Sequence, residues 1–353
     1  KDIERLGVGV RLEPDRARVQ AALATPRILR GWGGREWRAG NSLAVHPMEG
    51  CDGTTDGRPD TLVYRRYQRF GRGGCKLIWF EATAVVEEGR ANSRQLVINE
   101  HTAADLEKLL RTTRDAHREV YGSDRDLVCV LQLTHSGRWS YPSPIVAVHH
   151  PVLDRLKPAV RLIPDAELER LEQVYADRAR LALELGFDGV DLKMCHGYLG
   201  NELLASHLRP GPYGGSLENR TRLARNALAR IRQAVGDRLL LCVRLGTYDG
   251  LPYRVNPQTR LGEPREYDLP YRYGWGTAPD DPFREDLAET QQLIGCLRQW
   301  GVRLVNVTMG VPYFNPHVGR PFEKPDEGNY EPPEHPLVGV WRHFRIAGAL
   351  QRA

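Results

Sequence analysis

Short, continuous runs of apolar residues alternate with amphipathic segments along most of this chain. Such runs are typical of strands that are covered on both faces, as in a parallel sheet. We predict six strands, at residues 41–48, 75–85, 127–137, 189–197, 239–246 and 302–310.

Helical patterns lie between these strands. Residues 167–185 place leucines and a valine on one face before Gly186, residues 217–235 begin behind the N-cap residue Ser216, and residues 286–300 end before Gly301. Alternating strands and helices predict an α/β fold, and polar residues at the strand ends favour a (β/α)8 TIM barrel. The rival is a doubly wound open sheet, but no GxGxxG motif follows any strand, which counts against a dinucleotide fold.

The helical pattern at 337–352 is the sixth helix, so only about six barrel strands are evident in residues 1–353. We therefore expect a single barrel domain over residues 1–353 that is truncated at its C-terminus, or that another segment completes. Two long loops, 247–284 and 311–336, are expected on the active-site side of this barrel.

Composition narrows the classes of function. The formal charge of +5 is modest and the arginines are spread along the chain, which excludes a nucleic-acid stripe. No apolar run has the length of a membrane span, and residues 1–40 do not resemble a signal peptide. The six cysteines form no CxxC pair, so we predict free thiols, no metal site and a cytoplasmic protein.

Polar side chains gather at the ends of the first five predicted strands, where a barrel would form its mouth. They include Glu49, Glu81, Gln132, His135 and Arg244. The fourth strand adds Lys193, His196 and Tyr198 within DLKMCHGYLG, although the chain has only six lysines. These groups predict one ligand that needs donors, acceptors and a positive charge.

Several segments carry a family resemblance. GFDGVDLKMCHGYLGNELL (186–204), YGGSLENR (213–220), QLTHSGR (132–138) and VRL (243–245) resemble the Old Yellow Enzyme family in order and spacing. This is the NADH:flavin oxidoreductase family, which includes 2,4-dienoyl-CoA reductase and trimethylamine dehydrogenase. The resemblance extends over residues 25–350 and implies FMN as cofactor, with NADH or NADPH as electron donor.

The resemblance also implies roles for individual residues. Gln132 would bind the pyrimidine edge of the flavin, Arg244 would stabilise negative charge on the reduced ring, and Pro47 and Met48 would supply backbone contacts. His196 would bind the substrate oxygen and Tyr198 would donate a proton. An iron–sulfur cluster and FAD, which larger members carry, are expected only if the native chain extends beyond residue 353.

Two positions depart from the family pattern. Glu49 stands where a small polar residue is usual, and we assign it no role. Lys193 replaces the first histidine of the substrate-binding pair, and its cation suits a carboxylate or an enolate-like oxygen. The alternative is that Lys193 pairs with Asp191 or Glu202 at the rim.

The leading hypothesis is an ene-reductase that reduces an activated C=C bond of an enone, enoate or enoyl thioester. The partner would be a small molecule that bears a carboxylate or thioester. We expect no nucleic-acid partner and no membrane partner. The chain could form a homo-oligomer, or a second chain could complete the barrel. Alternatives are a flavin-dependent amine dehydrogenase or demethylase, and a non-catalytic barrel subunit without flavin. A metal hydrolase that uses His135 and His196 is the least favoured, because no third ligand has suitable spacing.

Overall fold

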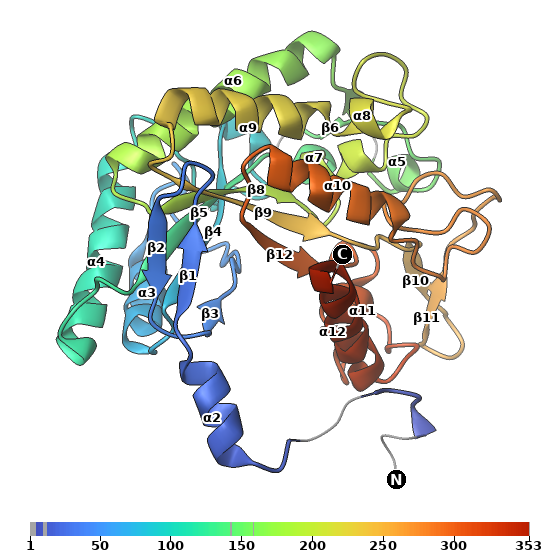
Figure 1. Cartoon of the computed structure of the whole chain (residues 1–353). Helices are drawn as coiled ribbons and strands as arrows, with labels where there is room; N and C mark the ends of the chain where they lie inside the picture. The colour runs from blue at the N-terminus through green and yellow to red at the C-terminus, as the bar shows by residue number, and fades with distance from the viewer. Residues whose placement is uncertain (1–4, 10–12, 142, 158, 353) are drawn as a thin grey trace.

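A single sheet of six parallel strands forms the centre of the computed structural model, which describes residues 5–9, 13–141, 143–157 and 159–352 (Figure 1). In spatial order the strands are β3 (Ala44–Val45), β4 (Leu77–Ala84), β5 (Val128–Thr134), β8 (Gly189–Met194), β9 (Leu240–Gly246) and β12 (Leu304–Thr308). This order follows the chain without reversal, so the sheet winds in one direction, as a barrel does. A doubly wound sheet would reverse its strand order at a switch point, which excludes that alternative.

The sheet is an open half-barrel over the described residues, because its edge strands β3 and β12 do not pair with each other. All six predicted strands are present, and the predicted α/β class is confirmed. The first strand is much shorter than predicted, since only Ala44 and Val45 pair with β4.

Helices cover the outer face of the sheet (Figure 1). They are α3 (Thr61–Arg72), α4 (Ala103–Tyr121), α6 (Asp165–Glu184), α9 (Arg222–Val235) and α10 (Ala288–Gln299). Every second strand residue, such as Leu131, Leu192 and Val243, points outward into one large apolar core with these helices. Burial on both faces explains why the strands are continuously apolar in the sequence.

The inner face of the sheet is built in layers. Near the start of the strands, Trp79, Val130, Leu240 and Cys242 form an apolar layer. An antiparallel hairpin of β1 (Arg27–Arg30) and β2 (Glu36–Ala39) covers this layer through Trp37 and Ala39. Two residues further along each strand, the inward positions become polar. The half-barrel is therefore closed at the bottom and polar toward its mouth.

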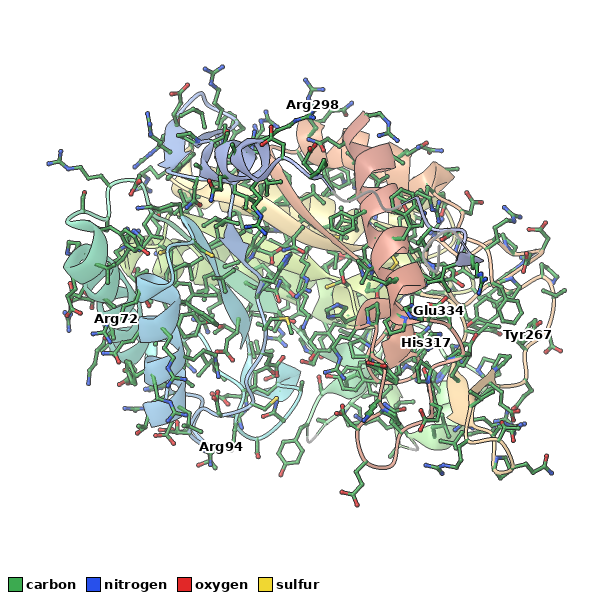
Figure 2. The ribbon with its side chains drawn as sticks, turned by 90° about the horizontal axis from the view of Figure 1, so that it is seen from below. Arg72, Arg94, Tyr267, Arg298, His317 and Glu334 are labelled. Atoms are coloured by element: carbon green, nitrogen blue, oxygen red, sulfur yellow. The ribbon has the colours of Figure 1, made fainter. Side chains whose placement is uncertain are left out.

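The remaining elements lie in the connections. They are α2 (Arg16–Ala24), α5 (Leu153–Leu156), α7 (Leu199–Leu204), α8 (Leu217–Arg220), α11 (Pro316–Gly319) and α12 (Pro336–Arg352), with the short pairs β6 (Ile145–Val146) with β7 (Arg161–Leu162) and β10 (Tyr253–Val255) with β11 (Gly262–Pro264). Helix α12 lies beside β12, and its Ile346 and Leu350 pack on Met309 and Val318. Figure 2 shows Glu334 and His317 beside α12, where Glu334 binds Arg342 at 2.6 and 2.8 Å.

Some predicted boundaries were wrong. The helix predicted at 217–235 is two helices, α8 and α9, that meet at Thr221. Ser216 does cap the first of them, because its hydroxyl accepts a hydrogen bond from the Asn219 amide at 3.3 Å. The loop predicted at 247–284 contains the β10–β11 hairpin, and the N-terminal hairpin was not predicted at all.

Among the described helices, none is both long enough and apolar enough to span a bilayer. Cys129, Cys195 and Cys242 are buried free thiols, as the sequence predicts.

Candidate active site

A cavity of about 820 Å³ opens at the carboxyl ends of β8, β9 and β12. Six of the predicted site residues line it: Pro47, Met48, Lys193, His196, Tyr198 and Arg244. Glu49 and Asn92 line it as well, together with Thr308, Tyr313, Arg320 and His343 from the C-terminal part of the chain. The predicted site residues from three strands thus share one cavity. Gln132 does not line it and is fully buried below it in the sheet.

A layer of polar side chains on β5, β8, β9 and β12 lies below the cavity as its floor; of Gln132, Asp191, Arg244 and Asn306 in this layer, only Arg244 lines the cavity itself. Asp191 is its centre: its carboxylate accepts hydrogen bonds from Trp79 Nε1 at 2.9 Å, from the Arg244 backbone amide at 2.6 Å, and from Gln132 Nε2. Burial raises the pKa of Asp191 to about 6, against these hydrogen bonds. Asp191 therefore fixes the position of Gln132 and leaves Lys193 unpaired.

Three buried polar atoms of this floor have no hydrogen-bond partner among the described residues. They are Gln132 Oε1, Arg244 Nε and Asn306 Oδ1, on β5, β9 and β12. Arg244 and Asn306 are register partners, and each has one further contact, Arg244 Nη1 to the Pro47 carbonyl at 3.0 Å and Asn306 Nδ2 to His46 Nδ1 at 2.9 Å. Buried polar atoms normally have partners, so this floor is suited to a ligand with donors and acceptors along a planar edge.

A tight turn after β8 directs His196 and Tyr198 to different parts of the cavity. His196 and Gly197 both have left-handed backbones, with φ of 65° and 70°. A side chain at residue 197 would lie 2.9 Å from Val311 and 3.0 Å from Trp139, so only glycine fits. The positive φ of His196 is unfavourable for a non-glycine residue. His196 Nε2 lies 3.2 Å from Thr308 Oγ1, and burial together with the Arg244 charge lowers its pKa, which favours a neutral ring.

Lys193 extends into the cavity from the inward face of β8 and is 6% exposed. Its ammonium lies 3.5 Å from the centre of the Tyr198 ring, a cation–π contact. The two carboxylates proposed from sequence as partners are engaged elsewhere, Asp191 in the floor and Glu202 with Arg138. No ion pair within 4.0 Å reaches Lys193 from any residue described. Burial lowers the pKa of Lys193, while Glu49 opposes this effect.

The Tyr198 hydroxyl contacts two further polar side chains, Tyr313 and Glu49. It lies 2.8 Å from the Tyr313 hydroxyl and donates to Glu49 Oε2 at 3.3 Å. Burial raises the pKa of Tyr198 well above its usual value, and Glu49 adds to this effect, so the hydroxyl keeps its proton. Burial also raises the pKa of Glu49. Tyr198 can therefore act as a proton donor and not as a base.

A buried ion pair holds the loop that carries Glu49. Glu81 accepts from Arg66 Nη2 at 2.5 Å and from the Gly50 amide at 3.0 Å, and Arg66 also binds Asp52 at 2.5 and 3.0 Å. Glu81 thus positions residues 49–52 and does not line the cavity.

His135 and Arg138 lie outside the cavity. His135 Nδ1 accepts from the Gly137 amide at 3.1 Å, and burial lowers its pKa to about 4. Arg138 is 1% exposed and binds Asp154 and Glu202. Among the residues that the structure describes, no three His, Cys, Asp or Glu side chains gather as a metal site would require.

Sequence reasoning missed Asn306, Thr308, Tyr313, Arg320 and His343. Asn306 and Thr308 occupy inward positions of a predicted strand, so their polarity was a usable signal. Tyr313 and Arg320 reach the cavity from the loop 311–336, which was predicted on the active-site side, and His343 reaches it from α12; no spacing in the sequence singles out these three residues.

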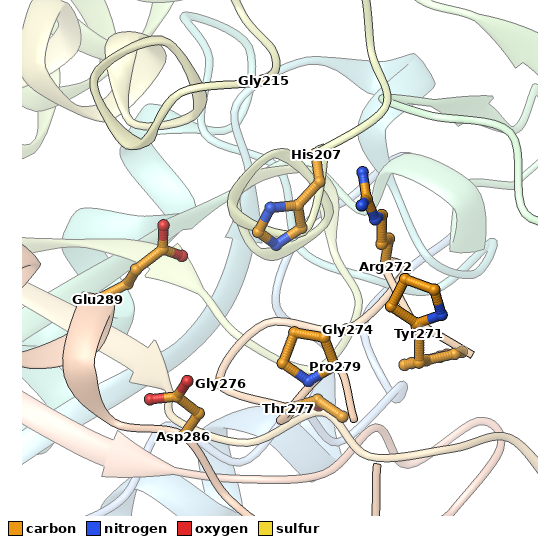
Figure 3. A pocket seen from close by; sticks show the side chains of 11 residues that line it. His207, Gly215, Tyr271, Arg272, Gly274, Gly276, Thr277, Pro279, Asp286 and Glu289 are labelled. Atoms are coloured by element: carbon orange, nitrogen blue, oxygen red, sulfur yellow. The ribbon is translucent and has the colours of Figure 1, made fainter. Parts of the chain in front are cut away.

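A second cavity, of about 560 Å³, lies between the 270–279 loop and the helices α8 and α10 (Figure 3). His207, Arg272, Asp286 and Glu289 line it. None of the predicted site residues lines this cavity, and Glu289 is engaged with Arg220 at 2.5 Å. The candidate active site is therefore the cavity at the strand ends.

Comparison with known proteins bears on the family to which the chain belongs. The family model of the NADH:flavin oxidoreductase / NADH oxidase family matches residues 40–255, which contain the strands β3 to β9. The chain belongs to this family. The match confirms the predicted resemblance, and a flavin with a nicotinamide donor is the chemistry of this family.

Relatives of this chain are moderately similar to it in sequence. An NADPH dehydrogenase of Geobacillus thermodenitrificans is 31% identical over 219 residues, which are 60% of this chain and 62% of that protein. The chain thus matches about three fifths of that relative's length.

Two solved structures share the fold. The Old Yellow Enzyme homologue from Zymomonas mobilis has a TM-score of 0.59 and 20% identity, over 91% of this chain and 79% of that one. Histamine dehydrogenase from Rhizobium sp. 4-9 has a TM-score of 0.58 and 21% identity, over 82% of this chain and 37% of that one.

The floor of the cavity fits the ring system of a flavin. Gln132 Oε1 can accept a hydrogen bond from a ring N–H. The guanidinium of Arg244, including its Nε, can donate to ring acceptors and stabilise negative charge on them. These are the residues that would hold the ring, with the Pro47 carbonyl already fixed by Arg244.

Proposed function

We propose that this protein is a flavin-dependent reductase of activated C=C bonds. The observation that carries the proposal is the convergence of Lys193, His196 and Tyr198 in one cavity above the Gln132–Arg244 floor. This cavity combines a lysine with no ion-pair partner among the described residues, an imidazole whose pKa burial lowers and a hydroxyl whose pKa burial raises. Lys193 and His196 can bind and polarise a carbonyl oxygen, and Tyr198 can protonate a carbon of the substrate.

When bound, FMN would carry hydride from NADH or NADPH to the substrate. The chain's own residues bind and orient the alkene. His196 and Lys193 donate to the substrate oxygen and withdraw electron density from the double bond. Tyr198 then donates its hydroxyl proton to the carbon next to the carbonyl. Arg244 lies at the floor, where its positive charge would stabilise negative charge on the ring.

The substrate class that fits best bears a carboxylate or a thioester. Lys193, Arg244 and Arg320 bring three cations to the cavity. The carboxylate of Glu49 is held by the Tyr198 hydroxyl and by Asn92 Nδ2, the latter at 3.0 Å, and burial raises its pKa. The cavity therefore favours anionic groups and polarised oxygens over cations.

An amine dehydrogenase is the second candidate, because histamine dehydrogenase shares the fold and the cavity contains the Tyr198 and Tyr313 rings. A cationic amine binds over such rings. However, the Lys193 ammonium already lies over the Tyr198 ring at 3.5 Å, where an amine would otherwise bind. The arrangement therefore supports alkene reduction.

Anaerobic half-reactions separate these candidates. The protein loaded with FMN is first reduced with NADH or NADPH and then mixed with an α,β-unsaturated carboxylate or ketone. The flavin absorbance at about 450 nm is followed during both steps. We expect the absorbance to return with the alkene. Bleaching of the oxidised flavin by an alkylamine, without reoxidation by any alkene, would contradict the proposal. A protein that retains no flavin would support the non-catalytic alternative.

The other predictions from sequence remain proposals. They are a cytoplasmic location, one FMN-binding barrel domain over residues 1–353, no partner among nucleic acids or membranes, and a homo-oligomer or second chain that completes the barrel.

A further inference from the structure

The Tyr198 hydroxyl is enclosed by protein. The residue is 3% exposed, and its hydroxyl contacts Tyr313 and Glu49, with the fully buried Ser136 also beside it. A proton donor that acts once per turnover must regain a proton before the next. Because bulk water reaches so little of Tyr198, that proton has to pass through a neighbouring group.

Tyr313 is placed to supply this connection. Its hydroxyl lies 2.8 Å from that of Tyr198, which is a normal O–H···O distance, and the residue as a whole is 45% exposed. Tyr313 therefore connects the buried Tyr198 hydroxyl to a residue that reaches the surface. Glu49 is less suited, because its contact with Tyr198 is longer, at 3.3 Å, and Asn92 holds its other oxygen at 3.0 Å.

The position of Tyr313 is fixed from two sides. Its ring stacks on Trp139 with centroids 4.2 Å apart and an interplanar angle of 14°, and Lys157 covers Trp139 at 5.5 Å. The loop that carries it is anchored by Asn315, whose Oδ1 accepts from the Val311 amide at 2.6 Å and whose Nδ2 donates to the Asp249 carbonyl at 2.7 Å. Such anchoring indicates a positioned hydroxyl and not a mobile surface side chain.

We propose that Tyr313 is the proton relay that reloads Tyr198. The inference rests on the proposed function. In the first step the Tyr198 O–H bond breaks as a C–H bond forms on the substrate. In the second, the Tyr313 O–H bond breaks as the Tyr198 O–H bond forms again, and Tyr313 takes a proton from water. Hydride comes from the nicotinamide donor, so each turnover consumes one NAD(P)H and one solvent proton.

Tyr313→Phe tests the relay, because it keeps the ring on Trp139 and removes only the hydroxyl. We expect flavin reduction by NAD(P)H to be unchanged. The first reoxidation by the alkene should also be unchanged, because Tyr198 begins protonated. Steady-state turnover should slow by roughly tenfold or more, with a larger solvent isotope effect and a fall in kcat rather than a rise in KM. The control is Tyr267→Phe, a tyrosine of similar exposure, 39%, at the periphery of the molecule (Figure 2).

Two outcomes would overturn the relay. One is that Tyr313→Phe turns over at the wild-type steady-state rate with the wild-type isotope effect. The other is that Glu49→Gln, and not Tyr313→Phe, gives the slow turnover, which would assign the proton path to Glu49. Both require a wild-type protein that reduces an alkene, and failure of that reaction would instead contradict the proposed function. Flavin content and thermal melting of each variant distinguish a lost hydroxyl from a lost fold.

Discussion

Tyr198→Phe should leave flavin reduction by NADH or NADPH intact and slow the reduction of the alkene about 10²- to 10⁴-fold, the usual range for a lost general acid. The reason is that Tyr198 donates a proton only in the second half-reaction. The phenylalanine ring would still support the Lys193 ammonium, which lies 3.5 Å from the ring centre, so substrate binding should change little.

Anaerobic stopped-flow mixing measures the two half-reactions separately. Tyr267→Phe, remote from the cavity, is the control for loss of a tyrosine hydroxyl in general. Equal slowing of both half-reactions by Tyr198→Phe would indicate a structural role. Unchanged reoxidation would show that another group donates the proton.

Lys193→Met should weaken the binding of carboxylate-bearing substrates and inhibitors by about 10- to 150-fold. This figure corresponds to about 1.5–3 kcal/mol for a hydrogen bond to a charged group. Methionine keeps most of the side-chain volume and removes the cation, so neutral ketones should lose much less. Ligand titration monitored by flavin absorbance gives both dissociation constants.

A matched control exists for this substitution. Lys108 also lies over a tyrosine ring, that of Tyr64 at 5.2 Å, but it is on the outside of α4 and not in the cavity. Lys108→Met should leave carboxylate binding unchanged. If Lys193→Met did the same, Lys193 would not be a substrate-binding residue.

Carboxylate binding should also depend on pH in a defined direction. Burial lowers the pKa of Lys193, although Glu49 raises it in part. The ammonium is present below that pKa and is lost as the pH rises through it. Carboxylate affinity should therefore fall on the alkaline side, at a lower pH than for an ordinary lysine, and Lys193→Met should remove this dependence. An affinity that rises with pH would contradict the assignment.

The sequence predicts this fold well where one strong pattern dominates. Strands buried on both faces have to be continuously apolar, so β4, β5, β8, β9 and β12 were all identified close to their ends. The N-terminal hairpin was missed because β1 is exposed and only alternate residues of β2 are buried. The break between α8 and α9 was missed because both segments share one apolar pattern.

The site was predicted where residues follow strands, since parallel strands bring their carboxyl ends together. Lys193, His196, Tyr198 and Arg244 were found in this way. Tyr313 and His343 were not singled out, because a loop and a helix far along the chain carry them to the cavity, although the loop 311–336 was itself predicted on the active-site side. Glu49 was noted only as a departure from the family pattern and was given no role. Its contact with the Tyr198 hydroxyl depends on the Glu81–Arg66 pair that positions its loop.

We propose that one cavity holds the flavin and presents Tyr198 to the substrate. A crystal structure of the protein with FMN and an unreactive carboxylate ligand tests it most directly. We predict the flavin ring against Gln132 and Arg244, the ligand carboxylate on Lys193 and His196, and the Tyr198 hydroxyl facing the ligand from the same side of the ring. A flavin bound elsewhere, such as in the cavity of Figure 3, or a ligand out of reach of Tyr198, would contradict it.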